Sequence, residues 1–252
     1  MNAINRTAEV LKLLSEGPRR FTGIARELQL TKSTAHRLLK ALEQTELIKK
    51  NSISGRYHLG PLIAQLAASP FSEHQFLISC SIEELRKLRD LSRETVTLQI
   101  PLGTERMCIE EIQSMESIKY VSGKGAIYPI FAGSAGKMLL AMMDNNQIDL
   151  LMQKFYYVPS VPNTIKNTEQ LWKEIELARK IGHSTSFGER ISGSASVAVP
   201  ITNYICPVIL NIVGPADRFT DNSISDILEE MKYSASRIAE ELTLGITRLG
   251  DV

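Results

Sequence analysis

Two short amphipathic segments near the start of the chain, with only two residues between them, restrict the fold more than any other feature. Residues 21–28 and residues 31–42 each carry apolar side chains at helical spacing. Thr22 and Thr31 stand where the N-caps of these helices are expected, because a threonine hydroxyl can accept a backbone N–H of the first turn. Gln29-Leu30 is long enough only for a tight turn, so the sequence predicts a helix-turn-helix.

Elements on both sides of this pair complete a small domain. A helix is expected over residues 4–14 and ends before Gly17-Pro18. After the pair, residues 47–50 and 56–59 have the pattern of two short strands around a turn of Asn, Ser and Gly residues. A hairpin directly after a recognition helix is a wing, so we expect a winged helix-turn-helix domain over residues 1–65.

Charge is divided unevenly between this segment and the rest of the chain. Residues 1–65 hold 11 Lys and Arg against 5 Asp and Glu, a net charge of +6, whereas the remaining residues hold 18 against 23, a net charge of −5. A solvated helix face also favours Lys and Arg, but a basic helix after a matched helix and turn is typical of recognition in the major groove. Tyr57 is a further candidate for DNA contact in the wing. The side chains predicted to contact double-stranded operator DNA are Lys32, Ser33, Thr34, His36, Arg37, Lys40, Lys50 and Arg56.

Residues 22–60 resemble the DNA-binding half of IclR-type (isocitrate-lyase-regulator type) transcription factors. The recognition helix of that family reads L-x-K-S-T-x-H-R-L-L, which this chain matches from Leu30 to Leu39. The wing of the family closes on R-Y-x-L-G, which the chain matches from Arg56 to Gly60. A departure occurs at Glu46-Leu47, where the family usually has Gly-Tyr or Gly-Leu. The resemblance implies a bacterial-type transcription factor.

Beyond the wing the pattern becomes that of a larger α+β domain. We expect a linker helix over residues 66–80, with Pro70 at the joint, and a second domain over residues 81–252. An alternating, β-branched run at residues 94–101 and a partner run at 106–112 predict a hairpin. The other expected elements are strands at 118–121, 194–201 and 207–213 and helices at 72–92, 134–144, 146–153, 168–181 and 221–244. Strands bracketed by helices, without repeated βαβ units, indicate an α+β sheet.

The second half resembles the GAF-like effector-binding domain of the same family. The matching stretches are IFAGSAGKMLLA (130–141), ELARKIGHSTSFGE (176–189), GSASVAVPI (193–201) and LNIVGPADRF (210–219). The chain departs from the family at Ser196, which is often Cys there, and at Ser186, which is often acidic. The resemblance implies a pocket for a small-molecule effector, lined by Tyr128, Ser134, Ala135, Ser186, Ser196, Asn211 and Val213.

The small residues at 133–137 stand at the start of an expected helix. Backbone N–H groups at a helix start, together with the helix dipole, favour a carboxylate or another anion. Close packing of the helix is the alternative explanation for Gly and Ala at these positions. With hydroxyl and amide groups and no carboxylate among the candidate wall residues, the sequence favours a small organic acid as the effector. In this interpretation Ser134 contributes only its backbone.

Two enzyme motifs overlap the same residues. Ser134 and Lys137 form S-x-x-K, and residues 132–136 read A-x-S-x-G, which is close to a nucleophile elbow. The companion motifs S-D-N and K-T-G are missing from the sequence, and His183 is the only histidine after Ser134. The two partial motifs leave one alternative hypothesis, a metabolic enzyme with Ser134 as nucleophile and an accessory DNA-binding head. A second alternative is a structural nucleic-acid-binding protein without a ligand.

The remaining features concern compartment, cofactors and assembly. Three distant cysteines, Cys80, Cys108 and Cys206, and four scattered histidines match neither a disulfide framework nor a zinc site, so we expect no metal and no cofactor. Without a run of about 18 apolar residues or a signal-peptide core, we expect a cytoplasmic protein with no membrane partner. One short recognition helix offers too few base contacts for a unique genomic site, so we expect a homodimer or homotetramer.

Overall fold

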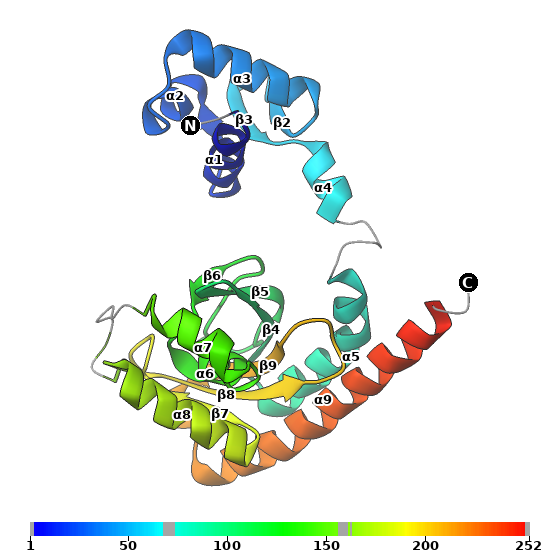
Figure 1. Ribbon diagram of the computed structural model, residues 1–252. Helices are drawn as coiled ribbons and strands as arrows, with labels where there is room; N and C mark the ends of the chain where they lie inside the picture. Colours follow the sequence, from blue (N-terminus) through cyan, green and yellow to red (C-terminus); the bar gives the residue numbers. More distant parts are fainter. Residues whose placement is uncertain (1–2, 68–73, 156–160, 162, 250–252) are drawn as a thin grey trace. The chain divides into compact units, whose positions relative to one another are not determined.

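The computed structural model in Figure 1 describes residues 3–67, 74–155, 161 and 163–249. The chain divides into two compact units, Met1–Gln75 and Phe76–Val252, which we call the head and the body. Part of the linker expected at residues 66–80, including Pro70, lies outside the described residues. None of the helices in the described ranges is long and apolar enough to cross a membrane.

The head is the winged helix-turn-helix that its sequence predicts. Its elements are α1 (Ala3–Ser15), β1 (Arg19–Arg20), α2 (Phe21–Glu27), α3 (Lys32–Gln44), β2 (Ile48–Lys50), β3 (Arg56–Leu59) and α4 (Pro61–Ala67). The strands form an antiparallel sheet in the order β1-β3-β2. Val10 of α1, Ile24 of α2, Leu39 of α3 and Ile48 of β2 are almost completely buried in one apolar core, which joins the three helices to the wing.

The starts of α2 and α3 differ in how they are capped. Thr31 is the N-cap of α3, as predicted, and its side chain accepts the N–H of Thr34 at 3.3 Å. The N-cap of α2 is Arg20, without a side-chain cap bond, so the prediction of Thr22 is wrong. Arg20 pairs with Arg56 in the sheet, and this strand carries extended backbone directly into the first turn of α2.

The body is built around one antiparallel sheet with the strand order β6-β5-β4-β9-β8-β7. Its strands are β4 (Thr95–Leu102), β5 (Glu105–Ile112), β6 (Ile127–Pro129), β7 (Ser184–Phe187), β8 (Ser194–Ile201) and β9 (Val208–Pro215). Its helices are α5 (Gln75–Ser92), α6 (Gly133–Ala141), α7 (Asn145–Met152), α8 (Thr168–Ile181), the short 3-10 helix η1 (Ala216–Arg218) and α9 (Asp221–Leu249). The hairpin β4–β5 and the pair β8–β9 confirm the expected α+β architecture.

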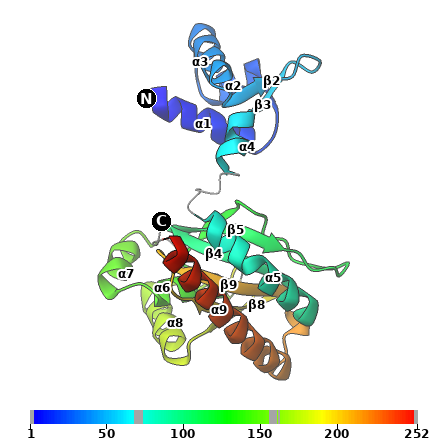
Figure 2. The same ribbon diagram turned by 90° about the vertical axis from the view of Figure 1, so that its right-hand side faces the viewer.

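Helices cover both faces of this sheet, as Figures 1 and 2 show. Successive side chains of a strand point to opposite faces, so each strand contributes to two cores. Val197 of β8 and Leu210 of β9 belong to the apolar cluster with α5 and α9, whereas their neighbours Ala198 and Ile209 belong to the cluster with α6, α7 and α8. This double coverage explains why β4 and β9 are buried along most of their length.

Residues 118–121, predicted as a strand, form an irregular loop, and that prediction is wrong. The edge strand on this side is β6 instead. The hydroxyl of Thr95 donates to the Tyr120 carbonyl oxygen at 2.6 Å, and the carboxylate of Glu111 accepts the N–H of Ser122 at 2.6 Å. Side chains therefore satisfy backbone groups that a strand would pair in a ladder.

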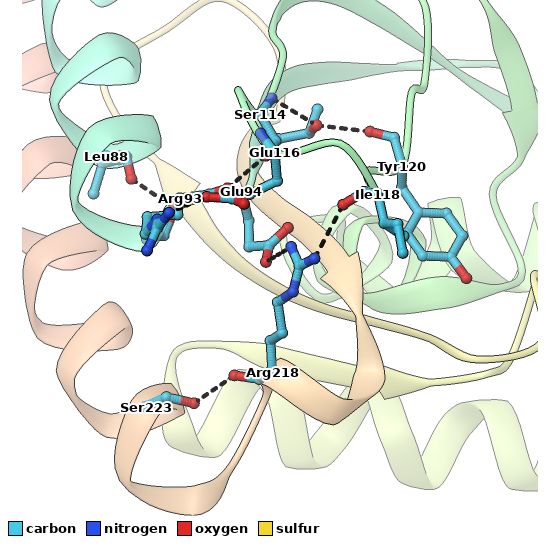
Figure 3. Close-up of polar contacts among 11 residues, drawn as sticks. Leu88, Arg93, Glu94, Ser114, Glu116, Ile118, Tyr120, Arg218 and Ser223 are labelled. Atoms are coloured by element: carbon cyan, nitrogen blue, oxygen red, sulfur yellow. Dashed lines mark hydrogen bonds and ion pairs between the residues drawn. The ribbon is translucent and has the colours of Figure 1, made fainter.

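A polar cluster connects this loop to the end of β9, as Figure 3 shows. Arg218 donates from Nη1 to Glu94 Oε1 at 2.9 Å and from Nη2 to the Ile118 carbonyl oxygen at 3.2 Å. Glu94 is 2% exposed, and burial raises the pKa of its carboxyl group although Arg218 acts in the opposite direction. The arginine thus compensates a buried acid and holds the loop against the sheet.

Candidate functional site

α6 is the central element of the body because it is buried along its whole length. Gly133 has a φ of +79°, a left-handed conformation that favours glycine. Gly136 lies against the preceding turn so closely that a Cβ there would be 2.2 Å from the carbonyl oxygen of Ile130. Close packing therefore explains Gly136, and it brings the start of α6 up to the sheet.

A small cavity that opens to solvent, with about 30 Å³ of space for the centre of a water-sized molecule, lies at this helix start. All seven side chains predicted for the effector pocket line it: Tyr128, Ser134, Ala135, Ser186, Ser196, Asn211 and Val213. The residues that the sequence analysis did not select are Gln99, Arg106, Ser122, Gly133, Arg190 and Ser194. The structure thus assembles one cavity from all six strands of the sheet (β4 to β9), the start of α6 and nearby loops.

Hydrogen-bonded hydroxyl and amide groups form the cavity wall next to the sheet. Ser134 Oγ lies 2.6 Å from Ser196 Oγ and donates to Asn211 Oδ1 at 2.8 Å. Asn211 Nδ2 in turn donates to Thr97 Oγ1 at 3.4 Å. The sequence analysis assigned Ser134 a role through its backbone alone, whereas the structure places its hydroxyl in the wall itself.

A carboxylate of the protein already occupies the first N–H of α6. Glu189 accepts the N–H of Gly133 at 2.9 Å, and its other oxygen lies 2.6 Å from Lys137 Nζ. Lys137 is 2% exposed and also lies 2.8 Å from Glu174. The two partners of Lys137 are thus acids, and among the described residues the lysine makes no bond to Ser134.

Two arginines supply the charge of the cavity. Arg106 of β5 is 4% exposed, and its Nε donates to Gln99 Oε1 at 2.8 Å while Nη1 donates to the Pro129 carbonyl oxygen. The ring of Tyr128 lies 5.7 Å from the Arg106 guanidinium carbon and 4.3 Å from that of Arg190. Burial, and then the neighbouring Arg190, lower the pKa of Arg106 to about 9, and burial also lowers the pKa of Arg190.

One signal in the sequence could have identified Arg106. Side chains of a strand alternate between faces, and Met107 and Ile109 of β5 pack into the core with α5 and α9. Arg106 and Cys108 must then face the side of α6, where a buried cation is unusual. Arg190 follows β7 in an irregular segment and carries no comparable signal.

The predicted DNA-contacting side chains share the surface of α3 and the wing. Seven of the eight are exposed, and the eighth, Thr34, is half-buried and hydrogen-bonded to Thr31 at 2.9 Å. The wing turn is held by Asn51, whose side chain accepts the N–H of Ser54 at 2.8 Å. Tyr57 is 7% exposed and belongs to the head core, so its ring supports the wing from inside.

The described parts of the chain contain no group of three or more His, Cys, Asp or Glu side chains able to hold a metal ion. No disulfide joins Cys80, Cys108 and Cys206, all of which the structure describes. Ser134 Oγ bonds to a hydroxyl and an amide, and no hydrogen bond joins it to a histidine among the residues that the structure describes. The guanidinium, hydroxyl and amide groups that line the cavity can donate hydrogen bonds.

Comparison with known proteins gives matches over most of the chain. A model of the IclR helix-turn-helix domain matches residues 3–52, and a model of the bacterial transcriptional regulator IclR C-terminal domain matches residues 73–240. The HTH-type transcriptional repressor AllR of Escherichia coli is 26% identical over 96% of this chain and 90% of the relative. The regulator XynR of the same organism is 27% identical over 96% and 97%.

Solved structures share the fold. The crystal structure of Thermotoga maritima IclR has a TM-score of 0.76 and 25% identity, covering 96% of this chain and 99% of that chain. An IclR homolog complexed with 4-hydroxybenzoate, from Microbacterium hydrocarbonoxydans, has a TM-score of 0.86 and 21% identity, covering 96% and 100%.

Proposed function

Because the chain belongs to the IclR family of bacterial transcriptional regulators, we propose that a small organic acid in the body cavity controls how tightly the head binds its operator. Regulation of transcription through DNA binding is the function of this family, and the alternative of an enzyme with Ser134 as nucleophile has no support. The observation that carries the proposal is the cavity, with two arginines and no acidic side chain among its lining residues.

The wall chemistry supports an acid rather than an amine. Guanidinium, hydroxyl and amide groups donate hydrogen bonds to a carboxylate, and the lining residues contain no carboxylate that would repel it. Tyr128 adds an aromatic face that tolerates a ring. An IclR homolog of the same fold was solved as a complex with 4-hydroxybenzoate, an aromatic organic acid of the class that we propose here.

The exposed polar face of α3 and the wing supports the DNA-binding part of the proposal. Arg37 lies in the second turn of α3 with its side chain exposed, where a recognition helix contacts base edges. Lys50 and Arg56 flank the wing turn and are placed for phosphates. Because one such head contacts few bases, we propose that the chain acts in the cytoplasm as a homodimer or homotetramer on a two-part operator.

Operator binding with and without acids tests this function. The promoter fragment of the neighbouring gene, labelled with a fluorophore, is titrated with the full chain at fixed salt, and binding is followed by anisotropy. We expect nanomolar binding, of the order usual for specific sites, that changes at least tenfold with one acid of a metabolite series. An affinity that stays constant across carboxylates, sugars and amines would overturn the ligand-responsive part.

A further inference from the structure

Two arginines of the cavity lack acidic partners. Arg190 makes no hydrogen bond or ion pair with any residue that the structure describes, and its guanidinium lies over the ring of Tyr128 at 4.3 Å. Arg106 is 4% exposed but bonds only to neutral groups, the side chain of Gln99 and the carbonyl oxygen of Pro129. The cavity thus holds two cations that form no ion pair with an acid among the described residues, and only Arg106 has an acid nearby, Glu189 on the N–H of Gly133, which favours its charged form.

Other arginines of the body show the arrangement that a structural role produces. Arg218 donates to the buried Glu94 at 2.9 Å, as Figure 3 shows. Arg237 lies 3.4 Å from Glu84, a buried acid of α5. In both cases the arginine neutralises a carboxylate that folding removes from water.

Burial without a counterion is unfavourable for a guanidinium. Burial lowers the pKa of Arg106 to about 9, which still leaves this group mainly protonated at neutral pH. The charges of these two arginines therefore do not stabilise the folded protein when no ligand is bound. An external ligand that brings the missing negative charge removes the penalty on binding.

The two guanidinium groups reach different parts of the cavity wall. A Cβ on Gly133 would lie 3.5 Å from Arg106 Nη2, so this arginine reaches the start of α6, where Ser134 lines the cavity. Arg190 lies beyond β7 and covers Tyr128. Two guanidinium groups from different parts of the chain thus border Tyr128 in one cavity wall.

We propose that the effector is a small dianion, with one acidic group at Arg106 and a second acidic group at Arg190. This inference rests on the proposed function, because it concerns the ligand of the same cavity. Arg190 is then the residue that separates acids with two charges from acids with one.

Matched pairs of acids test the second charge. Butyrate with succinate, valerate with glutarate, and 4-methylbenzoate with terephthalate share a carbon skeleton and differ by one carboxylate. Binding of each to the full chain is measured by calorimetry at constant ionic strength. In every pair that binds, we expect the dissociation constant of the dianion to be at least about tenfold lower than that of the monoanion. The reason is that its second carboxylate adds one charged hydrogen-bonded contact.

The variant Arg190→Gln removes the second charge and keeps the first. We expect the preference for the dianion to disappear in Arg190→Gln and to persist in the control Arg86→Gln, which removes an exposed ion pair of α5. Equal binding of both members by the parent protein would overturn the inference and leave the organic-acid proposal intact. If no acid binds or alters operator affinity, the proposed function fails, and the inference with it.

Thermal unfolding without ligand provides a second readout. Arg190→Gln removes an uncompensated cation, so we expect the melting temperature to rise by about 2 °C, whereas Arg218→Gln leaves Glu94 unpaired and lowers it. A fall for Arg190→Gln as large as that for Arg218→Gln would assign Arg190 to the fold and overturn the inference.

Discussion

Ser134 shows at the scale of one residue how the cavity wall is built. Its hydroxyl joins Ser196 and Asn211, which β8 and β9 contribute, to the start of α6. The bond at 2.8 Å to Asn211 Oδ1 also satisfies a buried acceptor. The side chain therefore supports the position of the N–H groups that an anion would meet.

The variant Ser134→Ala tests this division of roles. Loss of the hydroxyl removes one buried hydrogen bond, so we expect the free energy of unfolding to fall by about 1 kcal/mol and acid binding to weaken less than tenfold. Ser134→Pro removes the N–H in the first helical turn, where proline is tolerated, and we expect acid binding to be lost. Urea unfolding and calorimetry measure both effects. An alanine variant that folds but does not bind would assign a direct ligand contact to the hydroxyl.

Arg37 and Lys50 are expected to contribute differently to DNA binding. Arg37→Ala should lower operator affinity by about 1–3 kcal/mol and relax specificity, because the side chain is placed to read a base edge. Lys50→Ala should weaken binding to all DNA sequences. It should also reduce the slope of the logarithm of affinity against the logarithm of salt concentration by about 1, as expected for the loss of one phosphate contact. Titrations at several salt concentrations on operator and random DNA separate the two effects. Parent-like binding by both variants would contradict the assignment of α3 and the wing.

At the scale of elements, α6 depends on small residues more than on apolar ones. Gly136→Ala places a Cβ 2.2 Å from the Ile130 carbonyl oxygen, which is backbone and cannot rotate away. We expect the free energy of unfolding to fall by about 1–3 kcal/mol or more. Gly23→Ala in α2 is the matched control, since its Cβ would meet nothing within 4 Å and alanine favours a helix. Circular dichroism during urea unfolding measures the free energy of unfolding of both variants. If Gly136→Ala leaves this free energy unchanged, α6 can shift to accommodate the added methyl group, and the expectation is wrong.

The long elements could be predicted from the sequence because their patterns repeat. The eight-residue strand β4 alternates polar and apolar residues over most of its length, and α3 has both a cap and an apolar stripe. The two-residue β1 and the four-residue β7 are too short to show a period, and they form because β3 and β8 offer them free edges.

The cavity could be predicted only in part for a related reason. Its seven expected residues followed from the family resemblance. Arg106 and Arg190 are separated widely in the chain and meet across Tyr128 only after β5, β6 and β7 have joined one sheet. Local patterns carry no information about such contacts, because the sheet order decides them.

At the scale of the whole molecule, head and body each have a core of their own. The body contains two apolar clusters on the two faces of its sheet, and the head contains one. We therefore expect the fragment 74–252 to unfold cooperatively on its own. We also expect it to self-associate, which light scattering measures directly. If the fragment is folded but monomeric, the contact between copies must instead be made by the head or the linker.

The central claim is that a ligand in the body cavity alters DNA binding by the head. Ser186→Met tests it most directly, because it fills the cavity from β7 and changes no residue of α3 or the wing. Operator affinity is measured by anisotropy for parent and variant, with and without the acid that binds the parent. The account predicts equal affinity without acid and a response of at least tenfold in the parent alone. An equal response in both proteins would contradict it.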